Sequence, residues 1–250
     1  MKEITKDLLK KKYFIFDIDG TLVDSMIMWN KVDQEIILRE TGRFVDLMEI
    51  KAFRDSVIYN TEHIQGDIYL AYYDKLIQYY GINMTVEEYD KERSRMSGYI
   101  STNSLDYKAG ADEFLKLLKS MGKKIGVATT TTRAQYEIYE NKNQRMINKA
   151  SLRNLVDVKV LCEDVERKKP DPEAYLRVLE MFGATPKDCI IFEDSLNGVM
   201  AGKLAGVEVV AVYDDSSKDE LDKIKQVADY EAGSFDEILK IVSTEEEMQA

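Results

Sequence analysis

The stretch Phe16–Ser25 reads FDIDGTLVDS, and the expected fold is organised around it. It begins at the end of the apolar run Tyr13–Phe16, which predicts a short buried strand. Asp17 and Asp19 stand two positions apart after this strand, so their side chains point to the same side if extended geometry continues. Burying two carboxylates costs free energy unless a cation or a substrate compensates for it. An ordinary turn is the alternative interpretation, because Asp-Gly is a frequent hairpin sequence.

The second half of the chain alternates between strand-like and helix-like segments. Short apolar runs predict strands at 124–128, 156–161, 189–192 and 207–212. Helical patterns predict helices at 111–120, 133–150 and 195–204, and further helices that begin at Asp171-Pro172, Ser217 and Ser234. Strands that alternate with helices imply a parallel sheet covered on both faces, which is a doubly wound, Rossmann-like α/β core.

Polar side chains follow three of the predicted strands. Asp17 and Asp19 follow the first strand, Thr129–Thr132 follow the strand at 124–128, and Glu193 and Asp194 follow the strand at 189–192. Ligands of parallel sheets bind beyond the carboxyl ends of the strands. A single polar strand end arises easily by chance, but three of them at one edge indicate a functional site.

Asp17 and Asp194 together suit a magnesium ion, which takes few protein oxygens and keeps several waters. The cation would let a phosphate dianion approach a carboxylate that otherwise repels it. Thr129 is expected where a strand meets a helix, because Thr132 and Gln135 fit a capping box. Donors at a helix N-terminus bind phosphate, although a capped loop without any ligand is the alternative.

Lys169 lies in the basic segment 167–172, whose sequence is RKKPDP. Pro170 keeps Lys169 out of helical geometry and thereby restricts where its side chain emerges. A lysine held in this way suits pairing with both a carboxylate nucleophile and a phosphate. The other interpretation is a solvated charge cluster before a helix, which is the usual role of a basic run.

The segment 26–100 has a different pattern, with apolar residues at three- and four-residue spacing and almost no alternation. One helical stripe begins at Met26 and ends near Gly42, a second region spans 61–80, and a third begins at a capping box formed by Thr85 and Glu88. We therefore expect an inserted all-helical cap domain at 25–101. The α/β core domain then comprises 1–24 and 102–250.

The composition limits the classes of function. Apolar residues make up 44% of the 250, enough for a large core, and no segment approaches the roughly 18 apolar residues of a membrane-spanning helix. The net charge of −11 argues against nucleic acid as a partner. Cys162 and Cys189 lie in separate apolar segments, which is typical of free thiols in a reducing compartment. The charged segment 1–12 lacks a signal-peptide pattern, so we expect a cytoplasmic protein without a membrane partner.

Four segments, taken together, resemble the haloacid dehalogenase (HAD) superfamily, and within it the β-phosphoglucomutase-like phosphatases. The DxDGT motif of that family matches Asp17–Thr21, its strand-end Thr or Ser matches Thr129, its KPxP lysine matches Lys169, and its EDSxxG motif matches Glu193–Gly198. The likeness covers about 12–25 and 102–213, whereas the cap matches only in position and helical character. Four motifs in order and at suitable spacing are a specific signal.

The resemblance implies a magnesium-dependent phosphatase that acts on a small phosphorylated metabolite, a sugar phosphate being one candidate. Asp17 would be the nucleophile that forms an aspartyl-phosphate, and Asp19 would be the general acid and base. The implied phosphate-binding residues are Thr129, Thr130 and Lys169. The implied magnesium ligands are Asp17, the backbone carbonyl of Asp19 and Asp194, with Glu193 beside or behind them.

Other reactions of the family are less compatible with these residues. Haloacid dehalogenases and phosphonate-cleaving members lack an acid at the position of Asp19, so phosphate esters are favoured. The β-phosphoglucomutases carry a histidine twelve residues after the nucleophile, where this chain has Trp29. A sugar-phosphate mutase is thus the alternative function.

Outside this family there are two alternative interpretations. One is a phospho-accepting signalling module, but in such modules the accepting Asp lies in the middle of a shorter chain, whereas Asp17 ends the first predicted strand. A catalytically silent binding protein is the other, and the complete set of site residues argues against it. The oligomeric state stays open, and a monomer is compatible with the sequence.

Selection of the substrate would fall to the cap, which closes over the core in such enzymes. Lys51, Arg54 and His63 are the cap residues that we expect to contact the substrate. The segments 24–26 and 99–104 are the expected hinges.

Overall fold

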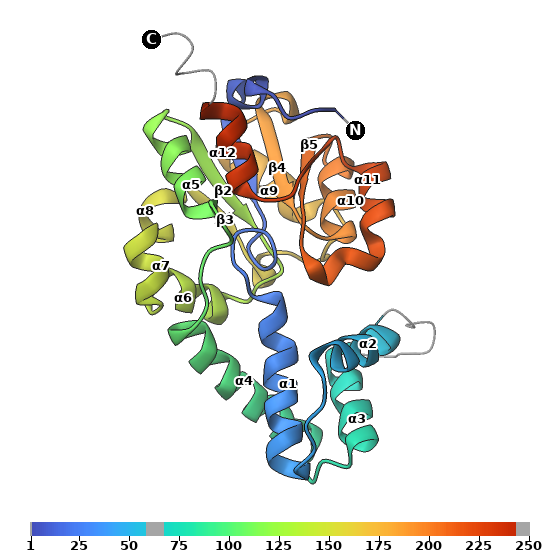
Figure 1. Ribbon diagram of the computed structural model, residues 1–250. Coiled ribbons are helices and arrows are strands. Elements are labelled where there is room, and N and C mark those ends of the chain that lie inside the picture. The colour runs from blue at the N-terminus through green and yellow to red at the C-terminus, as the bar shows by residue number, and fades with distance from the viewer. Residues whose placement is uncertain (1, 59–67, 244–250) are drawn as a thin grey trace. The chain divides into compact units, whose positions relative to one another are not determined.

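The computed structural model describes residues 2–58 and 68–243 (Figure 1). The chain forms two compact units, one comprising Met1–Ser25 and Thr102–Ala250 and the other Met26–Ser101. We call them the core unit and the helical unit. Within the described residues, no helix is both long enough and apolar enough to cross a membrane.

The core unit is built on one six-stranded parallel sheet with the strand order β3-β2-β1-β4-β5-β6. Its strands are β1 (Tyr13–Phe16), β2 (Lys124–Ala128), β3 (Val158–Val160), β4 (Cys189–Glu193), β5 (Glu208–Val212) and β6 (Tyr230–Ala232). Helices cover both faces of the sheet. The predicted doubly wound, Rossmann-like fold is therefore confirmed.

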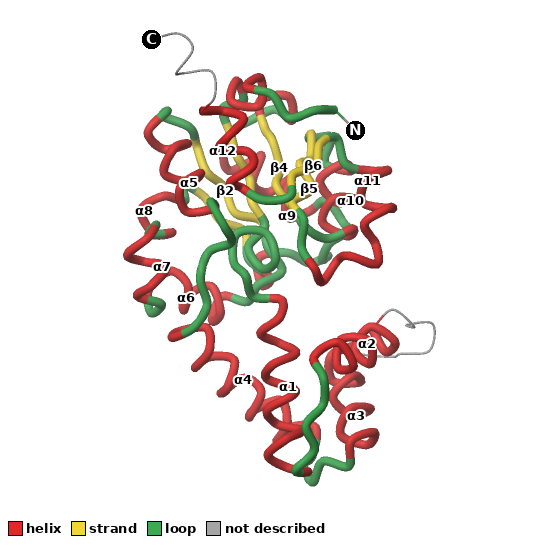
Figure 2. Tube along the Cα trace, in the orientation of Figure 1, coloured by secondary structure: helices red, strands yellow, loops and turns green. Residues whose placement is uncertain are grey.

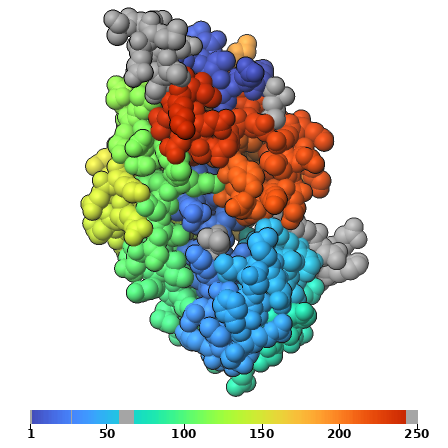
Figure 3. All heavy atoms as spheres, in the orientation of Figure 1, coloured from blue at the N-terminus to red at the C-terminus, as the bar shows by residue number. Residues whose placement is uncertain are grey.

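One face of the sheet is filled by an aromatic cluster under α5 (Ala111–Ser120) and α12 (Phe235–Ser243). The rings of Phe16 in β1 and Phe192 in β4 are stacked, with centroids 4.7 Å apart. The cluster consists of Phe14, Phe16, Phe114, Phe192 and Phe235. In the space-filling view α12 (red) packs against the green segment that includes α5 (Figure 3).

The opposite face is covered by α9 (Glu173–Phe182), α10 (Leu196–Leu204) and α11 (Leu221–Val227). Ile15 of β1 and Ile191 of β4 are fully buried there. Because β1 is covered on both faces, it is apolar throughout, as parallel strands usually are. Polar residues therefore begin only where the strand ends, at Asp17.

The register of the three central strands aligns their carboxyl ends. Phe16 pairs with Val127 of β2 on one side and with Phe192 of β4 on the other. The strand order runs from β1 through β2 to β3 on one side and from β4 through β5 to β6 on the other, so the order reverses between β1 and β4. Such a reversal is the arrangement that opens a ligand-binding crevice. The loops that follow these strands (green) gather at one end of the sheet (Figure 2).

Several element boundaries differ from the predictions. The helix predicted at 133–150 is divided into α6 (Arg133–Asn141) and α7 (Gln144–Lys149), followed by α8 (Leu152–Leu155), because the Asn143 side chain accepts a hydrogen bond from Met146 N and starts a new helix. The strand predicted at 156–161 is shortened to β3. The sequence did not indicate β6, since three residues are too few for a periodic pattern. Pro172 occupies the N-cap of α9, the place predicted for Asp171.

The two segments that flank the helical unit are joined within the core unit. Asp24 N donates a hydrogen bond to Asp106 O (3.1 Å), and Lys108 N donates one to Leu22 O (2.9 Å). Val23 and Tyr107 form an antiparallel bridge between these bonds. We call this pairing of 22–24 with 106–108 the stem.

The helical unit consists of α1 (Met26–Thr41), α2 (Leu47–Ile58), α3 (Ile68–Tyr80) and α4 (Val86–Asn103). The sequence did not single out α2, although it predicted helix throughout the insertion. A buried ion pair holds this unit together: Arg93 Nε donates to Asp33 Oδ1 over 2.7 Å. Asp33 also accepts hydrogen bonds of 2.8 Å from the hydroxyls of Tyr72 and Tyr89.

Candidate active site

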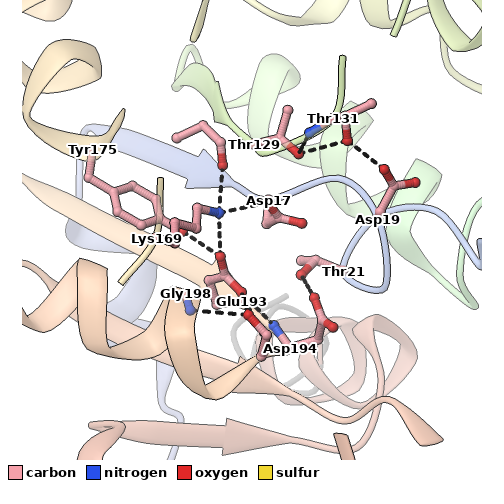
Figure 4. Close-up of polar contacts among 12 residues, drawn as sticks. Asp17, Asp19, Thr21, Thr129, Thr131, Lys169, Tyr175, Glu193, Asp194 and Gly198 are labelled. Atoms are coloured by element: carbon pink, nitrogen blue, oxygen red, sulfur yellow. Dashed lines mark hydrogen bonds and ion pairs between the residues drawn. The ribbon is translucent and has the colours of Figure 1, made fainter. Parts of the chain in front are cut away.

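Asp17 is the first residue after β1, and only 7% of its surface is exposed. Its backbone N donates to Phe192 O, which continues the sheet pairing for one more residue. Oδ1 accepts a hydrogen bond from Lys169 Nζ over 2.7 Å. Among the described residues Oδ2 has no hydrogen-bond partner, so one oxygen of this carboxylate is held and the other is left for a ligand (Figure 4).

Lys169 enters the site from the segment before α9 and uses all three of its donors. Nζ contacts Asp17 Oδ1, Ala128 O at 2.9 Å and Glu193 Oε1 at 2.5 Å. Burial by itself lowers the pKa of Lys169, but the charges of Asp17 and Glu193 outweigh burial and raise it above the ordinary range. The ammonium group therefore remains charged and ties the ends of β1, β2 and β4 together.

Glu193 ends β4 and is saturated with hydrogen bonds. Besides Lys169, its Oε1 accepts from the Tyr175 hydroxyl at 2.7 Å. Its Oε2 accepts from the backbone N of Asp194 and from the backbone and hydroxyl of Ser195. A Cβ at Gly198 would lie 1.9 Å from this carboxylate, so only glycine fits there. The carboxylate of Glu193 thus positions its neighbours and has little capacity left for a direct ligand.

Asp194 lies beside the nucleophile candidate, at the start of the loop after β4. Thr21 Oγ1 donates to its Oδ1 over 2.6 Å. Gly20 has a φ of +86°, and a Cβ there would lie 2.4 Å from Asp194 Oδ2, so this turn requires glycine on two grounds. Burial raises the pKa of Asp194 well above its usual range, and the nearby charges of Glu193 and Asp17 add to the rise.

The charges at this strand edge do not balance. Asp17, Glu193 and Asp194 are all buried, while Lys169 is the cation that pairs with two of them. Burial raises the pKa of Asp17 to about 7 in spite of Lys169, and Glu193 contributes to the rise. Excess buried negative charge of this kind is stabilised by a bound cation.

The donor set fits a hard divalent cation such as magnesium. Over 2–58 and 68–243 no three His, Cys, Asp or Glu side chains form a group that could hold a metal by themselves. Two carboxylates with one backbone carbonyl nevertheless suit magnesium, because this ion retains several waters. Asp17 and Asp194 offer those carboxylates, whereas the oxygens of Glu193 are already engaged.

Asp19 lies on the opposite side of Asp17 from Lys169, where Thr131 contacts it (Figure 4). Two hydroxyl groups hold its carboxyl. Thr131 Oγ1 donates to Asp19 Oδ2 over 2.5 Å, and the Tyr139 hydroxyl donates to Asp19 Oδ1 over 2.7 Å. Thr131 Oγ1 also shares a hydrogen bond of 2.8 Å with Thr129 Oγ1. The carboxyl of Asp19 is therefore connected to the end of β2 without touching an ionised group.

Comparison with known proteins decides the family. The model of the haloacid dehalogenase-like hydrolases matches residues 14–212, which is most of the chain. The chain belongs to this family. The predicted resemblance and the predicted hydrolase class are thereby confirmed.

Individual relatives of this haloacid dehalogenase-like hydrolase agree with that assignment. A phosphorylated carbohydrates phosphatase of Thermotoga maritima is 30% identical over 194 residues, which cover 78% of this chain and 81% of the relative. A haloacid dehalogenase-like hydrolase domain-containing protein of Arabidopsis thaliana is 28% identical over 139 residues, but the match spans only 40% of that longer protein. A HAD family hydrolase of Deinococcus radiodurans, solved with bound phosphate and sodium, has the same fold, with a TM-score of 0.70, 22% identity and coverage of 94% of this chain and 96% of that one.

Within this hydrolase the remaining predicted residues of the core unit lie as follows. Thr129 follows β2 and is buried, and its N donates to Val160 O. Thr130 is exposed, while the Thr132 side chain accepts from Gln135 N and caps α6 as predicted. A cavity of about 290 Å³ adjoins Asp194 on the side of β5 and β6, and Asp214, Lys225 and Glu231 are among its lining residues.

The candidates in the helical unit form a polar cluster of their own. Lys51 Nζ donates to Asp55 Oδ2 at 2.7 Å and is almost fully buried. Arg54 Nη1 donates to Asn30 Oδ1 at 2.9 Å. His63 lies outside the described residues. Contact of Lys51, Arg54 and His63 with a substrate remains a prediction.

Sequence reasoning missed three side chains that hold the site residues in place. Tyr175 and Tyr139 donate to Glu193 and Asp19, and Thr131 bridges Thr129 and Asp19. Thr131 carried a signal, because it lies in the polar run after β2. The two tyrosines carried none, since each lies on a helix whose apolar pattern does not indicate which carboxylate it faces.

Proposed function

We propose that this phosphoric monoester hydrolase is a magnesium-dependent phosphatase that acts on a small phosphorylated metabolite through an aspartyl-phosphate on Asp17. The observation that carries the proposal is the Asp17 carboxylate itself, held through Oδ1 by Lys169 and free at Oδ2. A carboxylate fixed in this way is oriented for attack by one oxygen, and the lost rotational freedom lowers the barrier to reaction.

The first step transfers the phosphoryl group to the protein. Asp17 Oδ2 forms a bond to phosphorus while the bond from phosphorus to the leaving oxygen breaks. Asp19, protonated before this step, gives its proton to the leaving oxygen, so that an alcohol and not an alkoxide departs.

The second step regenerates the enzyme. Asp19, now ionised, accepts a proton from a water molecule that attacks phosphorus. The bond between phosphorus and Asp17 breaks, which releases inorganic phosphate and restores both carboxyl groups. One side chain thus serves as acid and then as base, as microscopic reversibility requires.

Binding of the phosphoryl group would fall to the end of β2 and to Lys169. Thr129 Oγ1 and the backbone N of Thr130 would donate to the phosphoryl oxygens, and the charge of Lys169 would compensate part of the added negative charge. Asp17, the Asp19 carbonyl and Asp194 would hold a magnesium ion, which neutralises charge on the phosphate dianion when bound. Glu193 keeps Lys169 in place by accepting a hydrogen bond from its Nζ, and Gly198 leaves the space that the Glu193 carboxylate needs.

The substrate class is a proposal from the relatives. The Thermotoga maritima protein is named for phosphorylated carbohydrates, so a sugar phosphate is the first class to test. Choice among such substrates is assigned to the inserted helical unit acting as a cap, with Lys51 and Arg54 as candidate contacts. A cytoplasmic location agrees with free Cys162 and Cys189.

Release of inorganic phosphate from a panel of sugar phosphates, with magnesium and with EDTA, tests the proposal. We expect turnover that EDTA abolishes and that magnesium restores. Asp17→Asn should lower turnover by at least about a thousandfold, because the amide is no nucleophile. Asp222→Asn is the matched control, since Asp222 is exposed on α11.

Two results would contradict this function. Full activity in the Asp17→Asn variant excludes a covalent intermediate on that residue. Conversion of one sugar phosphate into another with little free phosphate would instead identify the mutase that the sequence leaves as the alternative.

A further inference from the structure

Two buried tyrosines of α6 differ in what their hydroxyl groups contact. The Tyr139 hydroxyl donates to Asp19 Oδ1 over 2.7 Å. Tyr136 lies one turn earlier on the same helix, is 1% exposed, and its hydroxyl has no hydrogen-bond partner among the described residues. A buried hydroxyl without a partner is unusual, so the contact of Tyr139 is not a general property of this helix.

Other polar side chains surround the Tyr139 hydroxyl. Those of Gln135 and Ser25 also lie within hydrogen-bond reach of it. The Ser25 hydroxyl donates to Val23 O, and the single proton of the Tyr139 hydroxyl goes to Asp19. Burial and the charge of Asp19 raise the pKa of Tyr139 well above its usual range, so the phenol stays a donor.

The two oxygens of Asp19 are held by different hydroxyl groups. Oδ1 accepts from the Tyr139 hydroxyl over 2.7 Å, and Oδ2 accepts from Thr131 Oγ1 over 2.5 Å. Thr131 Oγ1 in turn shares a hydrogen bond of 2.8 Å with Thr129 Oγ1. The orientation of the Asp19 carboxyl therefore depends on one hydroxyl at each of its oxygens.

We propose that Tyr139 is a positioning residue for acid catalysis: by donating to Oδ1 of Asp19, it fixes the orientation of this carboxyl beside the Thr129–Thr131 pair. The inference rests on the proposed role of Asp19 as the acid that protonates the leaving group. Without the hydroxyl, the carboxyl can rotate, so a smaller share of molecules is oriented for transfer. Tyr139 acts through Asp19.

The dependence of the rate on the leaving group separates this role from a general loss of structure. p-Nitrophenyl phosphate has a weakly basic leaving oxygen that departs without a proton, whereas phenyl phosphate has a similar shape and a more basic leaving oxygen. We expect Tyr139→Phe to lower kcat/KM for phenyl phosphate more than for p-nitrophenyl phosphate. Their ratio should change by about tenfold, which is less than the 10²–10⁴-fold that acid catalysis contributes as a whole.

Tyr136→Phe is the matched control, since it removes from the same helix a hydroxyl that has no hydrogen-bond partner among the described residues. Its ratio of the two kcat/KM values should equal that of the wild type. An unchanged ratio in Tyr139→Phe, even with lower rates for both substrates, overturns the inference. If Tyr139→Phe folds poorly, Gln135→Leu tests the same point, because it removes a side chain that forms a hydrogen bond with the Tyr139 hydroxyl. It should shift the ratio in the same direction, and an unchanged ratio there counts against the inference.

The Asp19→Asn variant distinguishes failure of this inference from failure of the proposed function. If Asp19 is the acid, Asp19→Asn must show a larger change in the ratio than Tyr139→Phe. A wild-type ratio in Asp19→Asn refutes the proposed role of Asp19 and with it the inference. A changed ratio in Asp19→Asn together with a wild-type ratio in Tyr139→Phe refutes only the role of Tyr139.

Discussion

The two units of the chain each bury a cluster of charged side chains, and the clusters differ in their balance. In the helical unit the single carboxylate of Asp33 meets Arg93 and two tyrosine hydroxyls, so every strong group has a partner. In the core unit one Lys169 serves the buried carboxylates of Asp17 and Glu193, and Asp194 lies beside them.

The difference separates a structural cluster from a candidate site. A neutral and fully paired cluster loses stability when any member is removed. In a cluster with excess negative charge, the carboxylates repel one another until a cation or a ligand binds. Removal of one acid relieves this repulsion, but we expect it to abolish the function. Buried charge alone is therefore a poor sign of a site, whereas unbalanced buried charge at the end of parallel strands is a good one.

The largest expected effect on stability comes from Asp33→Ala. This change leaves Arg93 buried without its carboxylate, and unfolding free energy should fall by about 3–5 kcal/mol. Trp29 is the only tryptophan of the chain, and Arg93 lies 4.5 Å from the centre of its ring, so tryptophan fluorescence during urea unfolding reports on the helical unit. Asp74→Ala, at an exposed position of α3, is the control and should change little. Equal stability of both variants would remove the distinction between paired and exposed carboxylates.

The next effect is of opposite sign and belongs to Asp194→Asn. Without metal, this variant should melt above the wild type, because it removes a buried carboxylate that Asp17 and Glu193 repel. Magnesium at a hundred times its dissociation constant should stabilise the wild type by about 2.7 kcal/mol and the variant far less. Calorimetry with magnesium and with EDTA measures both shifts. A magnesium response that persists in Asp194→Asn would show that this side chain is no ligand.

Asp17 makes the stability of the core unit depend on pH. Its pKa is raised from 3.8 to about 7 in the folded protein, chiefly by burial, so between these values the folded state binds more protons than the unfolded state. The stabilisation is complete below the unfolded pKa and is lost as the pH rises toward 7, with a slope of at most about 1.4 kcal/mol per pH unit. Unfolding in EDTA at pH 4 to 7 should show this decline in the wild type and a flatter profile in Asp17→Asn. Parallel pH profiles of the wild type and of Asp17→Asn would show that groups other than Asp17 cause the pH dependence.

The smallest effect is expected at Tyr136, whose unpaired hydroxyl belongs to neither cluster. Tyr136→Phe should raise the unfolding free energy by about 1 kcal/mol, because a buried polar group without a partner costs free energy. Urea unfolding followed by circular dichroism measures the change. A loss of stability of similar size would mean that the hydroxyl has a partner, such as an ordered water.

The parts of the site that sequence could predict are those governed by local periodicity. Alternating strands and helices place the ends of neighbouring parallel strands together, which is sufficient to bring Asp17, Thr129 and Asp194 to one edge. The role of Lys169 could be predicted from its match to the KPxP motif and from the restriction that Pro170 places on its backbone. The contact of Tyr139 with Asp19 and that of Tyr175 with Glu193 could not be predicted. No local pattern specifies which residue of a helix faces a carboxylate at the end of a strand.

The missed boundaries have equally local reasons. The break between α6 and α7 depends on the side chain of Asn143, which a helical pattern spanning 133–150 conceals. β6 is recognisable only by its pairing with β5. In the helical unit, the use of Asp33 as an acceptor for two tyrosines and an arginine reflects three-dimensional packing, and spacing along α1 gave no indication of it.

The stem has a consequence for how the chain could be divided. Because 22–24 and 106–108 are hydrogen-bonded to each other, the strands on either side are already held together where the helical unit departs and returns. The entropic cost of closing a loop across these paired segments grows only slowly with the length of the segment between them. The sheet and the candidate site at its edge can therefore host a different insertion at this point. Under the proposed role of the helical unit, exchanging it would change the substrate and leave the residues at the strand ends in place.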